Sequence, residues 1–392
     1  MKITQGRLVN TVLVLCTVLF VGQFAAAKQF GRSVTYLTYG HQPIEVVLGD
    51  FNRDGTLDIA TADIDGYFVS VLLGNGDGTF QSAVAYPAGP SWPTAIGVGD
   101  FNNDGKLDLV VANSGPHEFM ISVLTGNGDG TFQAPVSYPA GLSPLALAVA
   151  DLDQDGWLDV AVVNNASRGS LEPVDVMLNR AHGTFESAPY PAGDRLNSVA
   201  VGDLNGDGIP DLVVGSYTSS ASVLMGQGGG TFGKPTQVRI GYLNAFVTLA
   251  DFNNDGKLDL AASLGTGKVA IALGNGDGTF QSSLMHAVAP ALQGVGVGDF
   301  NQDGLPDIAV VAKNTTYGAY GTVSVLLGNG DGTFHSDAQY SANHGSVGIA
   351  VGDLNGDGFP DLVVANSYSP LSVSVLLNNG SQLVRRRASV AP

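Results

Sequence analysis

The sequence contains a single cysteine, Cys16, among its 392 residues. Because Cys16 lies in the apolar N-terminal stretch, the rest of the chain can form no disulfide and do no thiol chemistry. Basic residues are also scarce: 17 Lys and Arg stand against 35 Asp and Glu, which gives a formal net charge of −18. A nucleic-acid partner is therefore excluded, since binding phosphates needs a basic surface. No later segment keeps a 3.6-residue apolar period, which predicts essentially no helix.

The N-terminus has the three parts of a secretory signal peptide. Lys2 and Arg7 form a basic region, Thr11–Val21 is apolar, and Ala25–Ala27 offers small residues for cleavage. The apolar run is too short and wrongly flanked for a membrane span, so we expect residues 1–27 to be removed. The alternative is an uncleaved anchor. If the signal peptide is cleaved, we expect the mature chain to be secreted, periplasmic or on the cell surface, with no membrane span.

One acidic segment recurs along the whole chain. Its copies begin 48–54 residues apart, which is the length of a four-stranded propeller blade. The sequence is also rich in glycine, with 54 residues, which suits short strands and tight turns. We therefore predict an all-β fold, a seven-bladed β-propeller with four antiparallel strands per blade.

The second copy shows the internal order of a repeat. Apolar runs at Ala95–Val98 and Leu109–Ala112 flank the acidic loop, and strands at Ile121–Leu124 and Ala134–Tyr138 follow. The turn Gly126–Phe132, with the sequence G-N-G-D-G-T-F, closes a hairpin between the last two strands. It repeats at hairpin positions and precedes no helix, so it is not a phosphate-binding loop.

A ring of blades must close, or two sheet edges stay exposed. The N-terminal segment Phe30–Tyr39 resembles a fourth strand such as Phe80–Tyr86, whereas the last repeat ends near Leu377–Gly380 without the T-F sequence. We expect the N-terminal segment to supply the outer strand of the last blade. The propeller then spans residues 28–384, and residues 385–392 form a flexible basic tail, which we interpret as a solvated end rather than a site for acidic surfaces.

Each acidic loop has the pattern D-x-[D/N]-x-D-G-x-x-D. Three carboxylates within nine residues repel one another unless a cation binds between them, and Ca²⁺ prefers oxygen ligands of this kind. Gly at position 6 permits the sharp turn, and the variable residue at position 7 fits a ligand that binds through its backbone carbonyl. The predicted ligands, loop by loop, are Asp50, Asn52, Asp54, Thr56 and Asp58; Asp100, Asn102, Asp104, Lys106 and Asp108; Asp151, Asp153, Asp155, Trp157 and Asp159; Asp203, Asn205, Asp207, Ile209 and Asp211; Asp251, Asn253, Asp255, Lys257 and Asp259; Asp299, Asn301, Asp303, Leu305 and Asp307; and Asp353, Asn355, Asp357, Phe359 and Asp361.

Two other interpretations of the loops are weaker. An EF-hand needs Glu at position 12, where this chain has residues such as Thr61 and Val111, and it needs flanking helices. Ordinary Asp/Asn/Gly turns would not keep every ligand position in seven copies. Magnesium is disfavoured because it retains its waters. Removal of residues 1–27 takes away two basic residues and leaves a charge of −20, which seven Ca²⁺ would reduce to −6.

The repeats resemble the FG-GAP/VCBS repeats of integrin α-subunit propellers and of many bacterial secreted proteins, over about residues 30–384. Phe30-Gly31 is present, while Tyr-Pro-Ala-Gly replaces the Gly-Ala-Pro signature. In integrins some blades lack the acidic loop, but here none does. The resemblance implies calcium between the first two strands of each blade, with a structural role for the metal and a binding role for the propeller.

A ligand would bind where the repeats differ, on variable loops held by a rigid scaffold. The variable segments are 113–118, 164–172, 217–220 and 314–320, together with His41, Trp92, Arg195, Tyr242 and His344 between blades. Aromatic and polar side chains there suit protein or glycan ligands. We expect a non-catalytic binding or adhesion module.

Two other functions are left open by the sequence. One is a purely structural surface component. The other is a carbohydrate-active enzyme, above all a polysaccharide lyase, which needs a base beside an arginine or a metal. Its residues would come from His117, Arg168, Arg195, Tyr317 and His344, if folding brings them together.

Overall fold

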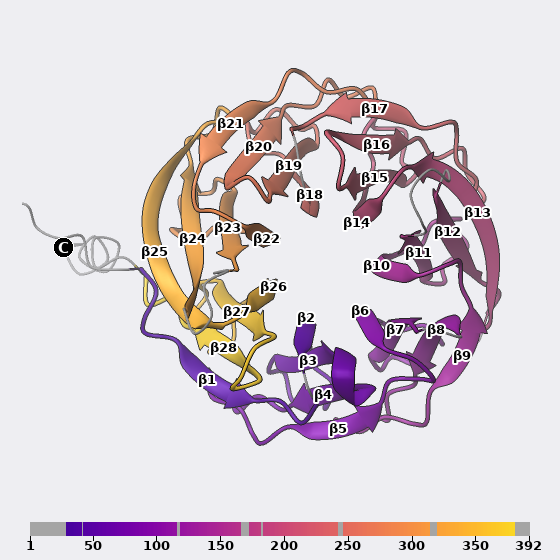
Figure 1. Ribbon diagram of the computed structural model, residues 1–392, viewed down its shortest axis with the longest axis vertical. Coiled ribbons are helices and arrows are strands. Elements are labelled where there is room, and N and C mark those ends of the chain that lie inside the picture. Colours follow the sequence, from indigo (N-terminus) through magenta and orange to yellow (C-terminus); the bar gives the residue numbers. More distant parts are fainter. Residues whose placement is uncertain are drawn as a thin grey trace, which may run out of the picture.

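The chain folds into a ring of seven four-stranded sheets around a central axis (Figure 1). The computed structural model describes residues 29–40, 42–115, 118–165, 172–181, 183–241, 246–313 and 320–380. The predicted signal peptide and C-terminal tail lie outside these residues. The described part contains one helical turn, the 3-10 helix η1 (Ile64–Gly66), and no helix there is long and apolar enough to cross a membrane.

Each blade contains four consecutive strands, except the last. Blades 1 to 3 consist of β2 (Pro43–Gly49), β3 (Asp58–Asp63), β4 (Phe68–Leu72) and β5 (Val84–Pro87); β6 (Pro93–Gly99), β7 (Asp108–Ser114), β8 (Phe119–Leu124) and β9 (Val136–Pro139); and β10 (Pro144–Ala150), β11 (Asp159–Asn164), β12 (Glu172–Asn179) and β13 (Phe185–Gly193). Blades 4 to 6 consist of β14 (Leu196–Gly202), β15 (Asp211–Ser216), β16 (Ser220–Leu224) and β17 (Thr236–Arg239); β18 (Phe246–Ala250), β19 (Asp259–Leu264), β20 (Lys268–Ala272) and β21 (Leu284–Ala287); and β22 (Leu292–Gly298), β23 (Asp307–Ala312), β24 (Tyr320–Gly328) and β25 (Phe334–His344). Blade 7 consists of β26 (Ser346–Gly352), β27 (Asp361–Asn366), β28 (Ser372–Leu376) and β1 (Val34–Leu37).

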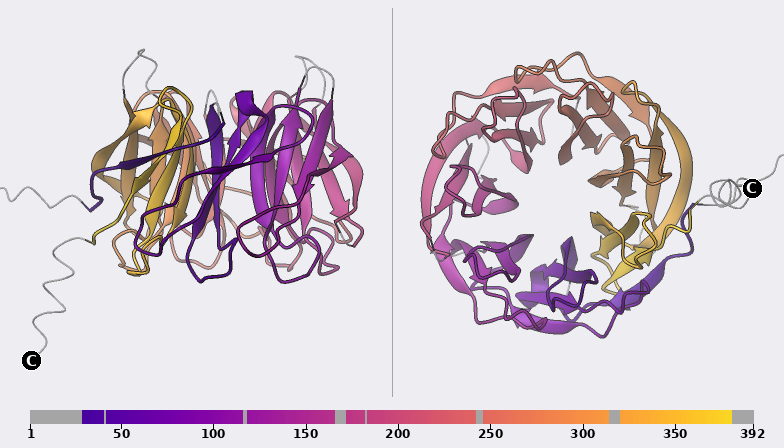
Figure 2. Two further views of the ribbon diagram at one scale, coloured as in Figure 1. Left: turned by 90° about the horizontal axis from the view of Figure 1, so that it is seen from below. Right: turned by 180° about the vertical axis from the view of Figure 1, so that it is seen from behind.

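The N-terminal strand closes the ring, as predicted. β1 pairs antiparallel with β28, from Val34 opposite Val375 to Leu37 opposite Ser372, and Phe30 bridges Asn378. In Figures 1 and 2 the indigo strand lies along the outside of the yellow blade. The predicted fold class, a seven-bladed propeller of four-stranded antiparallel blades, is confirmed.

The hydrophobic core lies between blades. In blade 1 the second strand is buried along its whole length, whereas the outer strand exposes its two ends. Ala62 and Val71, on β3 and β4 of blade 1, pack in one cluster with Ile96 and Leu109 of blade 2. A blade therefore buries its faces only against its neighbours, as in other repeat architectures.

Aromatic side chains join neighbouring blades. Phe51, at position 2 of the first acidic loop, packs edge-to-face on Phe132 of blade 2, and Tyr86 packs on the same ring from blade 1. At the closure, Phe30 takes the place of Phe132 and contacts Phe300 and Tyr340 of blade 6. Phe30 is therefore the N-terminal equivalent of the phenylalanine in the missing T-F sequence.

The connections between strands divide the ring into two faces. The acidic loops join the first and second strands, and the G-N-G-D-G-T-F turns join the third and fourth strands. Both lie on one side, since the Gly74 amide after β4 bonds to Asp58 and the Gly130 amide bonds to the carbonyl of Phe51. We call this side the acidic-loop face. The opposite face carries the second-to-third-strand loops and the links between blades.

Replacing Phe30 with alanine should weaken the closure. The ring is buried between blades 6 and 7, and removing a buried phenylalanine costs about 3–5 kcal/mol. Urea unfolding of Phe30→Ala should show a loss of this size. As the control, Leu37→Ala changes a residue of β1 that is 64% exposed and should shift stability by less than about 0.5 kcal/mol. Equal effects of the two changes would contradict the assigned closure.

Candidate metal centres

Every acidic loop folds around the same hydrogen bonds. In the first loop the amide of Asp54 donates to Asp50 Oδ1 and to Asn52 Oδ1, both at 3.0 Å, and the amide of Gly55 donates to Asp50 Oδ2 at 2.9 Å. The amide of Thr56 donates to Asp54 Oδ1 at 2.9 Å. The other six loops repeat all four bonds.

The backbone turns sharply at positions 4 and 6. Gly55 at position 6 has φ of +86°, and Arg53 at position 4 has φ of +62°. A Cβ added at Gly55 would meet no atom within 4 Å, so the backbone angle, not space, favours glycine. Position 6 was predicted from the sequence; the left-handed position 4 was missed, although Asn or Gly at four of its seven copies is a signal for it.

The aspartate at position 9 fastens the loop to the sheet. Asp58 Oδ2 accepts the amide of Phe51 at 2.8 Å, and Oδ1 accepts the amide of Gly74 beyond β4 at 2.8 Å. The other six loops make the same pair of bonds. These carboxylates are fully or almost fully buried, and their burial raises the pKa of Asp108 to about 6 and that of Asp361 to about 7. Sequence reasoning assigned position 9 a ligand role at the start of the next strand, but not these two hydrogen bonds.

The third loop gathers the most charge. Carboxylate oxygens of Asp151, Asp153 and Asp159 all lie within 4.8 Å of one another, while Asp155 is outside this group. Position 3 is an aspartate only here, and Arg180 Nη1 lies 3.0 Å from Asp153 Oδ2. A guanidinium thus offsets the additional carboxylate. Ion pairs in two other loops, Lys106 with Asp104 and Lys257 with Asp255, are exposed and contribute little.

The donor set of the loops fits a hard divalent cation. The predicted side-chain ligands are carboxylate and amide oxygens, which Ca²⁺ prefers, and no loop contains His or Cys. A carboxylate has about four acceptor positions, so the amide bonds at positions 1, 3 and 5 leave lone pairs for an ion. Positions 1, 3, 5, 7 and 9 of each loop, the predicted ligands, would hold it.

The G-N-G-D-G-T-F turns are closed by hydrogen bonds among their own side chains and amides, unlike a phosphate-binding loop. Asp77 Oδ1 accepts both the amide and the hydroxyl of Thr79, and Asn75 Nδ2 donates to the same hydroxyl. Three other turns repeat this closed arrangement. The structural interpretation of these turns therefore holds.

The opposite face carries those residues predicted for ligand binding that the structure describes. Trp92 Nε1 donates to the hydroxyl of Tyr67 at 2.9 Å, and Arg195 lies over the ring of Tyr217 at 5.2 Å. His344 stacks on Tyr320 with 4.4 Å between ring centres. His41, His117, Arg168, Tyr242 and Tyr317 lie outside the described residues.

Two of the five residues considered for a lyase are described, and they belong to different parts of the ring. Arg195 links blades 3 and 4, whereas His344 ends β25 of blade 6. His344 borders a groove of about 680 Å³ that Arg32 and Tyr320 also line. Folding thus places one of the two in a groove, with a different arginine nearby.

Seven four-stranded blades, each with one acidic loop on the same face, define a repeat propeller. Models of the FG-GAP-like repeat match residues 50–111, 100–162, 151–214, 203–262, 251–310 and 299–364, and the FG-GAP repeat matches 347–382. The protein belongs to the FG-GAP repeat family. No curated protein matches the chain.

Two solved structures are similar in fold. The crystal structure of BBS1N in complex with ARL6DN, soaked with lead, has a TM-score of 0.60 at 14% identity, covering 89% of this chain and 98% of that chain. The crystal structure of Chaetomium thermophilum Raptor has a TM-score of 0.56 at 12% identity, covering 90% of this chain and 29% of that chain. At such identities the likeness shows the fold alone.

The fastening role of position 9 can be tested apart from metal binding if the experiment is done in excess chelator. Without metal, Asp159→Ala should still lose about 2–6 kcal/mol, because it leaves two buried amides unpaired at about 1–3 kcal/mol each. Asp155→Ala changes an exposed carboxylate of the same loop and should cost much less. Denaturant unfolding of both variants in excess chelator measures the difference, and equal losses would show that position 9 does not fasten the sheet.

Proposed function

We propose that the protein is a secreted calcium-binding propeller that acts as a non-catalytic binding or adhesion module for an extracellular protein or glycan. Seven Ca²⁺ would bind, one in each blade, on the acidic-loop face. The ligand would bind on the opposite face. Secretion follows from the predicted signal peptide.

The observation that supports calcium is the identical loop in every blade. The network orders four acidic or amide side chains per loop, and cations pair with the acids at only three loops among the described residues. With free calcium about tenfold above Kd values of about 10⁻⁴–10⁻³ M, each site would add about 1.4 kcal/mol. Seven independent sites would add on the order of 10 kcal/mol, the stability of a whole domain.

Exposed aromatic residues support ligand binding on the opposite face. Five aromatic side chains of the described chain are 40–65% exposed; four lie in links or second-to-third-strand connections, and Tyr320 is the first residue of β24. They belong to an arc of neighbouring blades, 6, 7 and 1, and are Tyr320, Tyr368, Tyr39, Tyr67 and Trp92. We call this set the aromatic arc. Exposed rings with polar tips favour recognition of protein or sugar surfaces.

The alternative function is a polysaccharide lyase. One pair favours it: Arg195 over Tyr217, where burial raises the pKa of the Tyr217 hydroxyl despite the nearby guanidinium. A lyase base must lose its proton, and this direction opposes that loss at neutral pH. We therefore keep the binding function as the proposal.

Calcium binding predicts a count of bound ions. Metal analysis of the purified protein in saturating calcium should find seven Ca²⁺ per chain, and chelation should lower the melting temperature reversibly. Asp155→Ala should reduce the count to six. The control Asp194→Ala, which removes an exposed aspartate outside the loops, should leave seven. A wild-type count far below seven would reject the proposal.

Ligand binding predicts that the aromatic arc is required. Glycan and protein-partner screening, with and without chelator, should identify a ligand, and the double variant Trp92→Ala/Tyr320→Ala should bind it at least tenfold more weakly. Leu142→Ala removes a 63% exposed side chain from the link between blades 2 and 3 and should bind like the wild type. Unsaturated products from acidic polysaccharides would instead establish the lyase. Empty screens would favour a structural component.

A further inference from the structure

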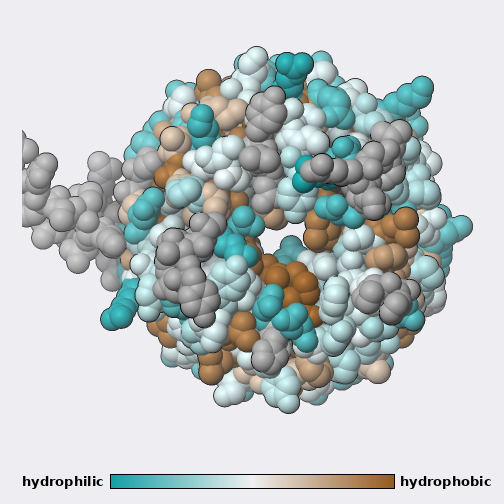
Figure 3. Space-filling model, in the orientation of Figure 1, coloured by the Kyte–Doolittle hydropathy of each residue, from teal (hydrophilic) through white to brown (hydrophobic). Residues whose placement is uncertain are grey.

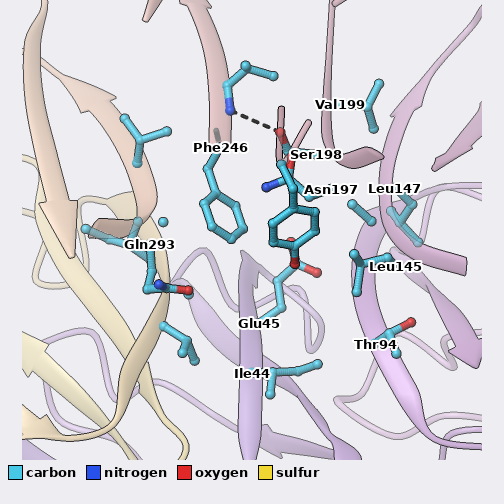
Figure 4. A pocket seen from close by; sticks show the side chains of 18 residues that line it. Ile44, Glu45, Thr94, Leu145, Leu147, Asn197, Ser198, Val199, Phe246 and Gln293 are labelled. Atoms are coloured by element: carbon cyan, nitrogen blue, oxygen red, sulfur yellow. Dashed lines mark hydrogen bonds between the residues drawn. The ribbon is translucent and has the colours of Figure 1, made fainter. Parts of the chain in front are cut away.

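The ring encloses a central channel, and a pocket lies at one end of this channel. The pocket has a volume of about 300 Å³ and is lined by residues near the start of the inner strands of all seven blades, together with Tyr217 from the loop after β15. Each inner strand ends at its acidic loop, so the pocket lies at the end of the channel away from those loops. A hollow is visible at the centre of the ring in Figure 3, and the lining side chains are drawn in Figure 4.

Among the described residues, one charged side chain lines this pocket, that of Glu45. In the described part of the seven inner strands, all residues except Glu45 are uncharged. The residues at the position of Glu45 in the other blades, counted from the aspartate at loop position 9, are Ala95, Ala146, Ser198, Phe246, Gly294 and Gly348. A carboxylate therefore replaces a small or apolar residue at one place in the ring.

A contact between blades does not explain the charge. Glu45 Oε2 accepts the amide of Ile96 in blade 2 at 3.0 Å. In blade 4 the equivalent Ser198 makes the equivalent bond, with its Oγ accepting the amide of Val247 at 3.2 Å (Figure 4). A neutral hydroxyl thus suffices to join the blades. The bond between the blades therefore does not require the negative charge of Glu45.

The surroundings of Glu45 suit an organic cation. Phe246 and Glu45 point into the same cavity (Figure 4). Tyr217 also lines it, but the guanidinium of Arg195 already lies over that ring, which leaves Phe246 as the uncovered aromatic side chain. No Lys or Arg lines the pocket among the described residues, and burial raises the pKa of Glu45 to about 7, with the amide of Ile96 opposing it. Aromatic rings attract ammonium groups through their faces. One carboxylate offers too few oxygens for Ca²⁺, which takes six to eight.

We propose that this channel pocket binds a small organic ammonium ion, with Glu45 as its counter-ion and Phe246 as its aromatic wall. Apolar side chains such as Leu145 and Val199 would cover the carbon part of the ligand. The volume lies at the small end of the range for ligand sites. The site is separate from the calcium loops and from the aromatic arc, and it does not rest on the function proposed above.

Choline and its neutral isostere 3,3-dimethylbutan-1-ol test the proposal. Both should be titrated into the full-length protein in calcium-containing buffer at pH 8.5, above the pKa of Glu45, with binding measured by calorimetry or saturation-transfer NMR. The wild type should bind choline at least tenfold more tightly than the alcohol. Glu45→Gln keeps an oxygen for the Ile96 amide but removes the charge, and should abolish this preference. Phe246→Leu should weaken choline more than the alcohol.

A matched control separates the pocket from the general negative charge of the protein. Glu186→Gln makes the same change on outer strand β13 and should keep the preference for choline. Melting curves of both variants establish that they fold. Equal affinity of the wild type for choline and the alcohol would overturn the proposal, and so would a Glu45→Gln variant that folds and still prefers choline.

Discussion

Burial of each sheet against its neighbours is the constraint on which the structure depends. A blade has no core of its own, since clusters such as that of Ala62, Val71, Ile96 and Leu109 span two blades. The chain must therefore close into a ring, and the N-terminal strand completes the last sheet. Phe30 supplies both the missing pairing and the missing aromatic contact between blades 6 and 7. Closure covers the edge of β28 with β1, so the last blade has four strands like the others.

The acidic loops extend the same logic to charge. The position-9 carboxylate lies within the packed sheet and joins the loop, the second strand and the third-to-fourth-strand turn through two amides. Positions 1, 3 and 5 face outward and use loop amides to hold their oxygens in place. A scaffold without disulfides thus concentrates its negative charge at the loops between packed strands. A divalent ion bound there would offset the repulsion between the carboxylates and would also restrain the turn.

Much of the fold and of the candidate metal sites could be predicted from the sequence because the same pattern occurs in seven repeats. The acidic pattern, the strand order and the closing role of Phe30–Tyr39 are local or periodic features. The fastening by position 9 could not be predicted, since its partner Gly74 lies 16 residues away across two strands. Glu45 was missed for a similar reason. Only the ring brings its carboxylate to Ile96 of the next blade and opposite Phe246 of the fifth.

The two faces differ in how closely the repeats agree, and the difference separates scaffold from recognition. On the acidic-loop face seven blades carry one motif, so a single blade adds stability but no specificity. Towards the opposite face the blades diverge: rings gather over blades 6, 7 and 1, and one carboxylate stands among small residues in the channel. The charge of Glu45 is not needed to hold the sheets together, because the hydroxyl of Ser198 makes the same bond in blade 4. A repeat protein can vary such positions without losing its fold, and departures from the repeat are therefore where ligand recognition can evolve.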